Sequence, residues 1–166
     1  WAAKGTLNGY YRDNQPNKWH WSAEFIQYCM RGNSEFQNLQ WMGAQKGNHQ
    51  HYWRAAKQNT DKMSGGGLAE GEWFYLSMEE SNNIGYQIQV GDLVMQGTGG
   101  RHHGDIVVAT TGGPSRASGI VKVGGNLSNS CKASSSRNTA IVTQNPSARE
   151  LYLKSIGASN PNTDLA

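Results

Sequence analysis

The sequence predicts an α+β fold in which helices come first and an antiparallel sheet of about five strands follows. Apolar residues in the first third recur at helical spacing, whereas the second half holds short β-branched runs bounded by glycine. Elements segregated in this way along the chain are typical of α+β domains. A chain of 166 residues suits one domain with one core, so we expect a single domain over residues 1–166.

The first predicted helix, residues 21–32 with the sequence WSAEFIQYCMRG, is the segment around which the chain is organised. Gly32 follows its last periodic residue, where a terminating glycine is common. One face of this helix is apolar and comprises Trp21, Phe25, Tyr28 and Cys29. We expect the Phe25 and Cys29 side to pack against the sheet, with Cys29 as a small buried hydrophobe.

Ser22 lies in the first turn of this helix. Unpaired backbone N–H groups and the positive end of the helix dipole stabilise negative charge there. Such a position suits a nucleophile whose reaction develops an oxyanion. A serine here is also a good helix N-cap, although Phe25 stands where a capping box would have Glu or Gln. Both interpretations of Ser22 stay open at this point.

The remaining elements follow from periodicity and from turn residues. Further helices are predicted at about 34–41, 48–57 and 146–156, the last one starting after the capping pair Asn145-Pro146. Strands are predicted at 90–95, 104–109 and 119–123, with weaker ones at 130–133 and 139–143. Residues 58–72 contain three consecutive glycines and are predicted to form a flexible loop, and the polar residues 1–18 a covering arm.

Composition excludes some classes of partner. The net charge of +3 and a charged fraction of 16% are too mild for nucleic-acid binding, and no run of Lys or Arg forms a patch. No segment approaches 18 apolar residues, so no membrane span is expected. Many Asn, Gln and Ser residues, together with six Trp and seven Tyr, suit an uncharged polar polymer such as a glycan or a peptide. Two cysteines do not make a disulfide scaffold.

A nucleophilic serine needs a base, and histidine is the usual one. His102 and His103 precede the second predicted strand, and strand alternation allows only one of them to face a given cleft. His103 would share its face with Asp105, whereas a surface pair of histidines in a Gly-rich turn is the alternative. The group that orients the imidazole would be Asp105, by proximity, or Asn126, at the end of the next strand.

A metal site is the competing interpretation of the histidines. His49 and His51 are two residues apart, and His102 and His103 are adjacent. Neither spacing matches an HExxH motif or is accompanied by a CxxC pair. We therefore expect no metal and no cofactor.

Five blocks in order carry a resemblance to a known family: WSAEFIQYCM, NHQHYWRAA, VGDLVMQ, HHGDIVVAT and IVKVGGNLSNS. Together they resemble the uncharacterised domain family DUF2272 over about residues 19–131. That family is related to the NlpC/P60 and CHAP cysteine peptidases, which have a papain-like core. The resemblance implies the same core here, with the N-terminal helices packed on the sheet.

The resemblance also assigns roles to residues. Ser22 takes the place of the nucleophile, which is Cys in the wider family, while His103 takes that of the base and Asn126 that of the orienting group. Three further residues would line the substrate groove, two of them in a His-x-x-Tyr pattern: Trp21, His49 and Tyr52. Because a hydroxyl is far less acidic than a thiol, a serine in this place depends wholly on its base.

The implied function is hydrolysis of bacterial cell-wall peptidoglycan, by an amidase or an endopeptidase. Two alternatives remain: a non-catalytic module that binds wall glycan or peptide, and an acyltransferase acting on a lipid or an amine. The chain begins at Trp1, so we expect it to be excised from a longer protein whose other domains are its partners. Proteins of this kind are secreted, periplasmic, injected or virion-associated.

Overall fold

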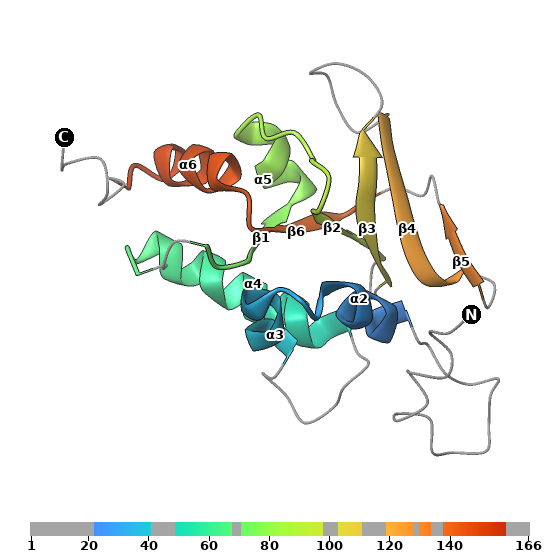
Figure 1. The fold of residues 1–166 in the computed structure, drawn as a ribbon. Coiled ribbons are helices and arrows are strands. Elements are labelled where there is room, and N and C mark those ends of the chain that lie inside the picture. Colours follow the sequence, from blue (N-terminus) through green and yellow to red (C-terminus); the bar gives the residue numbers. More distant parts are fainter. Residues whose placement is uncertain are drawn as a thin grey trace.

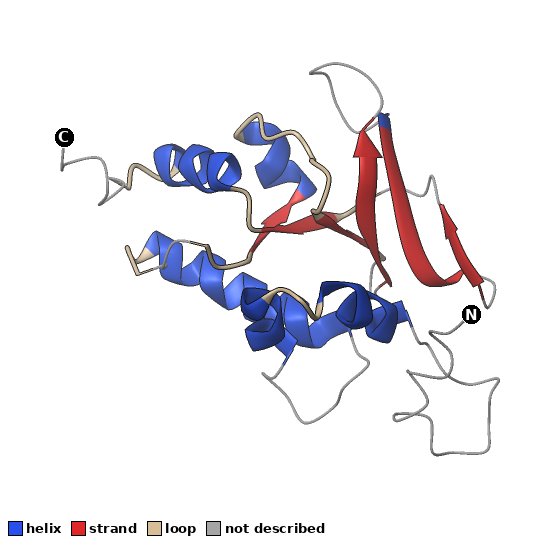
Figure 2. Cartoon of the chain, in the orientation of Figure 1, coloured by secondary structure: helices blue, strands red, loops and turns tan. Residues whose placement is uncertain are grey.

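The computed structural model describes residues 22–40, 49–67, 71–97, 103–110, 119–127, 130–133 and 138–158. In these residues the chain forms an α+β fold with one six-stranded antiparallel sheet (Figures 1 and 2). The predicted α+β class is therefore confirmed. The proposed covering arm, residues 1–18, lies outside the described residues.

The strand order in the sheet is β1-β6-β2-β3-β4-β5. The strands are β1 (Phe74–Ser77), β2 (Leu93–Gln96), β3 (His103–Thr110), β4 (Ile120–Leu127), β5 (Ser130–Ala133) and β6 (Ala140–Thr143). All five predicted strands are present, and β1 is an additional one. A helix starts at Met78 directly after β1, so no glycine or proline turn marks the end of this strand, which explains why β1 was missed.

The described helices are α2 (Ser22–Met30), α3 (Ser34–Gln40), α4 (His49–Ser64), α5 (Met78–Asn83) and α6 (Pro146–Ser155). Helix α6 begins as predicted, because the Asn145 side chain accepts a hydrogen bond from the Ser147 N–H and Pro146 occupies the first turn. Helix α5 was not predicted. It begins with a complete capping box between Ser77 and Glu80.

The prediction of a loop over residues 58–72 was wrong for its first part, because α4 continues to Ser64. Two polar residues on this extra length are buried against β1. The Asn59 side chain donates to the Trp73 carbonyl (2.7 Å), and the Thr60 hydroxyl bonds both the carbonyl (2.7 Å) and the N–H (2.8 Å) of Tyr75. The helix and the missed strand therefore stabilise each other through tertiary contacts that local sequence patterns do not contain.

The prediction about the buried face of α2 was wrong for Cys29. Cys29 is exposed, whereas Ala23 and Ile26 are fully buried. Helix α2 does pack beside β3 and β4, as expected, and Phe25 is half-buried and packed against the core. Apolar residues lie on more than one side of this helix, so periodicity alone did not select the face.

The central strands are buried on both faces. Helices α2, α3 and α4 lie on one side of β1, β6 and β2, and α5 and α6 lie on the other (Figure 1). Leu93 and Val142 belong to the core on the first side, while Val94 and Ile141 belong to the core on the second. All four residues of β6 are buried for this reason.

A polar cluster is buried at the turn that leads into β2. Asp92 accepts hydrogen bonds from the Tyr86 hydroxyl (2.7 Å), the Thr143 hydroxyl (2.6 Å) and the Gln89 N–H (2.9 Å). Burial raises the pKa of Asp92, and these three donors act in the opposite direction. We refer to Tyr86, Gln89, Asp92 and Thr143 as the turn cluster.

Candidate active site

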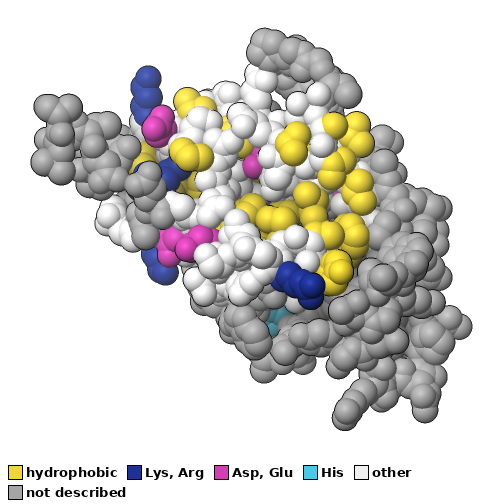
Figure 3. All heavy atoms as spheres, viewed as in Figure 1, with side chains coloured by type: hydrophobic (Ala, Val, Ile, Leu, Met, Phe, Trp, Pro, Cys, Tyr) yellow, Lys and Arg dark blue, Asp and Glu magenta, His cyan; other side chains and the backbone are white. Residues whose placement is uncertain are grey.

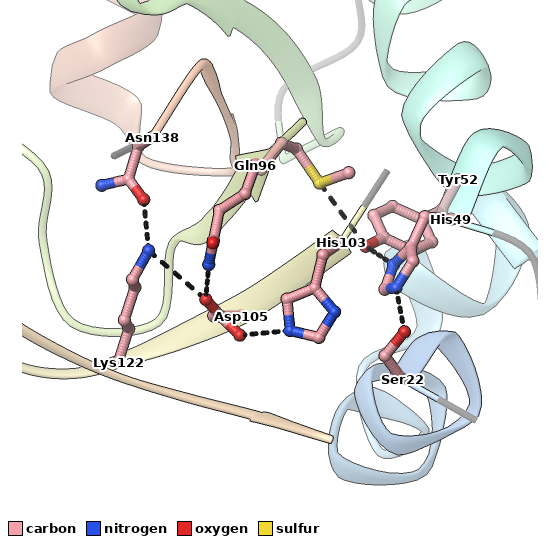
Figure 4. Close-up of polar contacts among 9 residues, drawn as sticks. Ser22, His49, Tyr52, Gln96, His103, Asp105, Lys122 and Asn138 are labelled. Atoms are coloured by element: carbon pink, nitrogen blue, oxygen red, sulfur yellow. Dashed lines mark hydrogen bonds and ion pairs between the residues drawn. The ribbon is translucent and has the colours of Figure 1, made fainter. Parts of the chain in front are cut away.

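Ser22 at the start of α2 meets His49 at the start of α4. The distance from Ser22 Oγ to His49 Nε2 is 2.6 Å, and the two side chains are buried, with exposed fractions of 3% and 4% (Figure 4). A hydroxyl and an imidazole at this distance can exchange a proton. The structure therefore places a nucleophile and a base in contact, from two helices whose first residues lie 27 positions apart.

The other ring nitrogen of His49 is held by Tyr52, one helical turn further along α4. His49 Nδ1 lies 2.6 Å from the Tyr52 hydroxyl, which in turn lies 3.5 Å from the sulfur of Met95 on β2. Tyr52 is completely buried, and its ring also packs on Phe36 of α3 at a centroid distance of 5.6 Å. Burial raises the pKa of the Tyr52 hydroxyl far above its ordinary value, and the negative charge of Asp105 raises it further.

A second histidine lies beside this pair. His103 opens β3, and its ring centroid is 5.7 Å from that of His49 (Figure 4). His103 Nε2 is 2.9 Å from Asp105 Oδ1, so the two side chains share one face of the strand, as predicted. The His103 side chain is 23% exposed and Asp105 is fully buried. Among the two histidines, His103 is thus the one that solvent reaches.

Asp105 is the centre of its own polar network. Its Oδ2 lies 3.4 Å from Lys122 Nζ on β4 and also accepts from the side-chain amide of Gln96. Lys122 Nζ donates in addition to Asn138 Oδ1 at 2.6 Å. Burial lowers the pKa of Lys122, and Asp105 acts in the opposite direction. A buried carboxylate with a buried ammonium beside it holds the His103 ring in one orientation.

Two glycines leave room for the side chains of the site. A Cβ at Gly104 would collide with the Tyr52 hydroxyl and would lie 3.0 Å from His49 Nδ1. A Cβ at Gly124 would collide with Asp105 and would lie 2.8 Å from His103 Nε2. The backbones of β3 and β4 therefore approach the site more closely than any other residue type would allow.

The structure brings together four of the residues that the sequence singled out: Ser22, His49, Tyr52 and His103. Trp21 and His102 lie outside the described residues. Asn126 lies on β4, but its side chain is also outside the described part. The sequence interpretation gave His49 and Tyr52 a place in the groove and gave the base to His103, whereas the described hydrogen bond of Ser22 goes to His49.

Sequence reasoning missed Lys122, Gln96 and Asn138. For Lys122 a signal existed, because a lysine in the middle of the apolar run Ile120–Val123 has to be exposed or paired with a buried acid. Gln96 and Asn138 carry no such signal. In the described part of the chain, no group of three His, Cys, Asp or Glu side chains is close enough to hold a metal ion. His49 and His51 point in different directions from α4, since positions two apart do not face each other on a helix.

The surface of the described residues is mixed in character. Hydrophobic side chains gather on the side of β3 and β4, where Val108 and Val121 are exposed, and acidic and basic groups are scattered (Figure 3). None of the helices in the described residues combines the length and the hydropathy needed to cross a membrane. In comparisons with family models, curated proteins and solved structures, the chain has no match.

Proposed function

We propose that this chain is a serine hydrolase of bacterial peptidoglycan, an amidase or an endopeptidase, on a papain-like NlpC/P60 core. The observation that carries the proposal is the 2.6 Å contact between Ser22 Oγ and His49 Nε2 at the start of a helix. Serine is a poor nucleophile without a base, and this contact supplies one.

In the proposed reaction Ser22 Oγ attacks the carbonyl carbon of an amide bond while His49 Nε2 takes the hydroxyl proton. Backbone N–H groups in the first turn of α2 stabilise the oxyanion of the tetrahedral intermediate. The proton then passes to the leaving amine as the C–N bond breaks, leaving an ester on Ser22. Water hydrolyses this ester, with the imidazole again as the base, and restores the hydroxyl.

His103 is the second candidate for the base, and it is the one that the family resemblance implies. Its ring is next to that of His49 and is oriented by Asp105. We give the base role to His49 because of its direct contact with Ser22. Asn126 stays a predicted orienting group, with Asp105 as the described alternative, and Trp21 stays a predicted groove residue.

The substrate class rests on the resemblance of five ordered blocks to DUF2272 and its peptidase relatives. Composition agrees with it, since a weakly charged chain rich in Asn, Gln, Ser and aromatic residues suits glycan strands and their peptides. The partner in this proposal is the wall polymer.

One observation favours a second candidate function, a non-catalytic module that binds cell-wall glycan or peptide. Ser22 and His49 are almost completely buried, and a buried hydroxyl–imidazole pair can serve structure alone. In that case the hydrogen bond between the serine and the histidine holds α2 against α4, and the wall polymer is bound by other surfaces.

The test is incubation with purified peptidoglycan, followed by mass analysis of the released fragments. We expect fragments that differ from the intact polymer by the addition of water across an amide bond, and none with Ser22→Ala. Binding to the sacculus without any fragment release, from wild type and Ser22→Ala alike, would favour the binding module.

A further inference from the structure

A chain of three contacts runs from the nucleophile into the core. Ser22 Oγ lies 2.6 Å from His49 Nε2, His49 Nδ1 lies 2.6 Å from the Tyr52 hydroxyl, and that hydroxyl lies 3.5 Å from Met95 Sδ. His49 and Tyr52 are three residues apart, so both side chains project from the same face of α4. Their separation is therefore set by a rigid helix rather than by two independent elements.

We propose that Tyr52 is a positioning residue that fixes the tautomer of His49. Its hydroxyl oxygen accepts the Nδ1–H of His49, which leaves Nε2 unprotonated and directed at the hydroxyl of Ser22. This inference rests on the proposed hydrolase function. Tyr52 would then fill the place that a carboxylate or an amide fills beside the histidine in other hydrolase triads.

The number of available protons and acceptors decides which atom donates in each of these hydrogen bonds. If Tyr52 accepts from His49, the Ser22 proton goes to Nε2 and the Tyr52 proton goes to the Met95 sulfur, so each donor has an acceptor. If Tyr52 instead donates to Nδ1, Nε2 carries the proton. The Ser22 hydroxyl then has no acceptor among the residues that the structure describes. Buried donors are rarely left in that state, so the first arrangement is favoured.

The hydroxyl of Tyr52 suits this task because it stays neutral. Its pKa is raised far above the ordinary value by burial, with the charge of Asp105 acting in the same direction. Tyr52 therefore does not give up its proton to His49, and its oxygen lone pair accepts the Nδ1–H of the ring. Gly104 lies against both side chains, and a Cβ there would collide with the Tyr52 hydroxyl and lie 3.0 Å from His49 Nδ1.

The first test is the protonation pattern of the His49 ring, read from ¹⁵N NMR of the uniformly labelled chain at neutral pH. We expect Nδ1 to carry the proton and Nε2 to show the shift of an unprotonated nitrogen. A wild-type spectrum with the proton on Nε2 would overturn the proposal, and this measurement does not depend on any variant folding.

The second test compares two tyrosine variants. Tyr52→Phe keeps the ring that packs on Phe36 but removes the acceptor, and we expect its His49 signal to move towards the Nε2–H form. Tyr86→Phe is the matched control, because Tyr86 is also a buried tyrosine with a hydrogen-bonded hydroxyl and a raised pKa. It belongs to the turn cluster, so its loss should leave the tautomer of His49 unchanged.

Reaction with a fluorophosphonate probe gives a functional reading that needs no natural substrate. We expect labelling at Ser22, slowed about tenfold or more in Tyr52→Phe, since general-base catalysis is worth roughly 10²- to 10⁴-fold and part of it is lost. Equal labelling rates in Tyr52→Phe, Tyr86→Phe and wild type would overturn the positioning role. A wild type with the expected tautomer and labelling, but without fragments from peptidoglycan, would refute the proposed substrate and leave this inference standing.

Discussion

Two buried polar clusters in this molecule are built from similar residues and differ in what they can do. The turn cluster contains a tyrosine and an aspartate, Tyr86 and Asp92, and the candidate site contains the corresponding pair Tyr52 and Asp105. In the turn cluster the Tyr86 hydroxyl, the Thr143 hydroxyl and the Gln89 N–H all donate to the Asp92 carboxylate, so the cluster fixes a turn. In the site the Tyr52 hydroxyl, the His49 ring and the Ser22 hydroxyl are hydrogen-bonded in series, with the His103 ring beside them, so this network can move a proton.

The difference between the clusters shows which features distinguish a candidate active site from a polar cluster that only stabilises the fold. Burial and a raised tyrosine pKa occur in both, so neither distinguishes them. The site alone joins a nucleophile to a titratable ring, and it includes His103, whose side chain is partly exposed.

The largest effect is expected at Ser22. Ser22→Ala should abolish fragment release from peptidoglycan while the fold persists, because losing the buried hydrogen bond from Ser22 to His49 costs only about 1–3 kcal/mol of stability. Fragment analysis and thermal unfolding monitored by circular dichroism measure the two quantities. Ser22→Cys should retain or raise activity, because a thiol beside an imidazole at a helix N-terminus has a lowered pKa and attacks as the thiolate. Full activity in Ser22→Ala would remove the nucleophile from the proposal.

The two histidines should differ in how far their loss lowers kcat. His49→Ala should lower kcat by roughly 10²- to 10⁴-fold, the usual range for a general base, whereas His103→Ala should lower it less. The measurement is kcat of both variants on the same peptidoglycan preparation. The opposite ranking would return the base role to His103, as the family resemblance implies.

A smaller effect is expected from the glycine that faces the site. Gly104→Ala should displace Tyr52 and His49, because the added Cβ would collide with the tyrosine hydroxyl, and kcat should fall with it. Gly32→Ala is the control, since a Cβ at Gly32 would meet nothing within 4 Å. Fluorophosphonate labelling rates of the two variants give the comparison, and equal rates would mean that the close approach of β3 is not needed.

The smallest effect concerns the turn cluster and appears in stability alone. Burial raises the pKa of Asp92 in the folded chain, so the native state holds this proton to a higher pH than the unfolded chain does. The contribution of Asp92 to stability is then fully present below its unfolded pKa and is lost as the pH rises through the folded pKa. Urea unfolding measured at a series of mildly acidic pH values should show that wild type loses stability relative to Asp92→Asn as the pH rises. If the free energy of unfolding changed with pH in the same way for both proteins, the raised pKa would be contradicted.

Much of the fold could be predicted because its elements carry their own local signals. The Asn145-Pro146 pair marked the start of α6, and β-branched runs marked β3 and β4. The strand β1 and the second half of α4 could not be read in this way. They depend on hydrogen bonds from Asn59 and Thr60 to a strand about 15 residues away, which form only when the two segments meet.

The sequence allowed several residues of the site to be predicted, but not the contacts between them. Ser22 was identified from its place at a helix start, and His103 with Asp105 from strand alternation. The contact between Ser22 and His49 joins two helices, and no local pattern specifies how two helices cross. Lys122 could have been identified as a buried partner of Asp105, because its position within an apolar strand leaves a charge that needs compensation.

The place of β6 in the sheet has a consequence for how the chain folds. Strand β6, residues 140–143, pairs with both β1 and β2, which lie 44 or more residues earlier and are not neighbours of each other in the sheet. A growing chain therefore exposes apolar edges on β1 and β2 until residue 143 has been synthesised. Such late, long-range pairing slows folding and favours association of incomplete chains. The chain should thus reach its native sheet only after translation has passed Thr143, and a chaperone that covers strand edges until then should raise its yield.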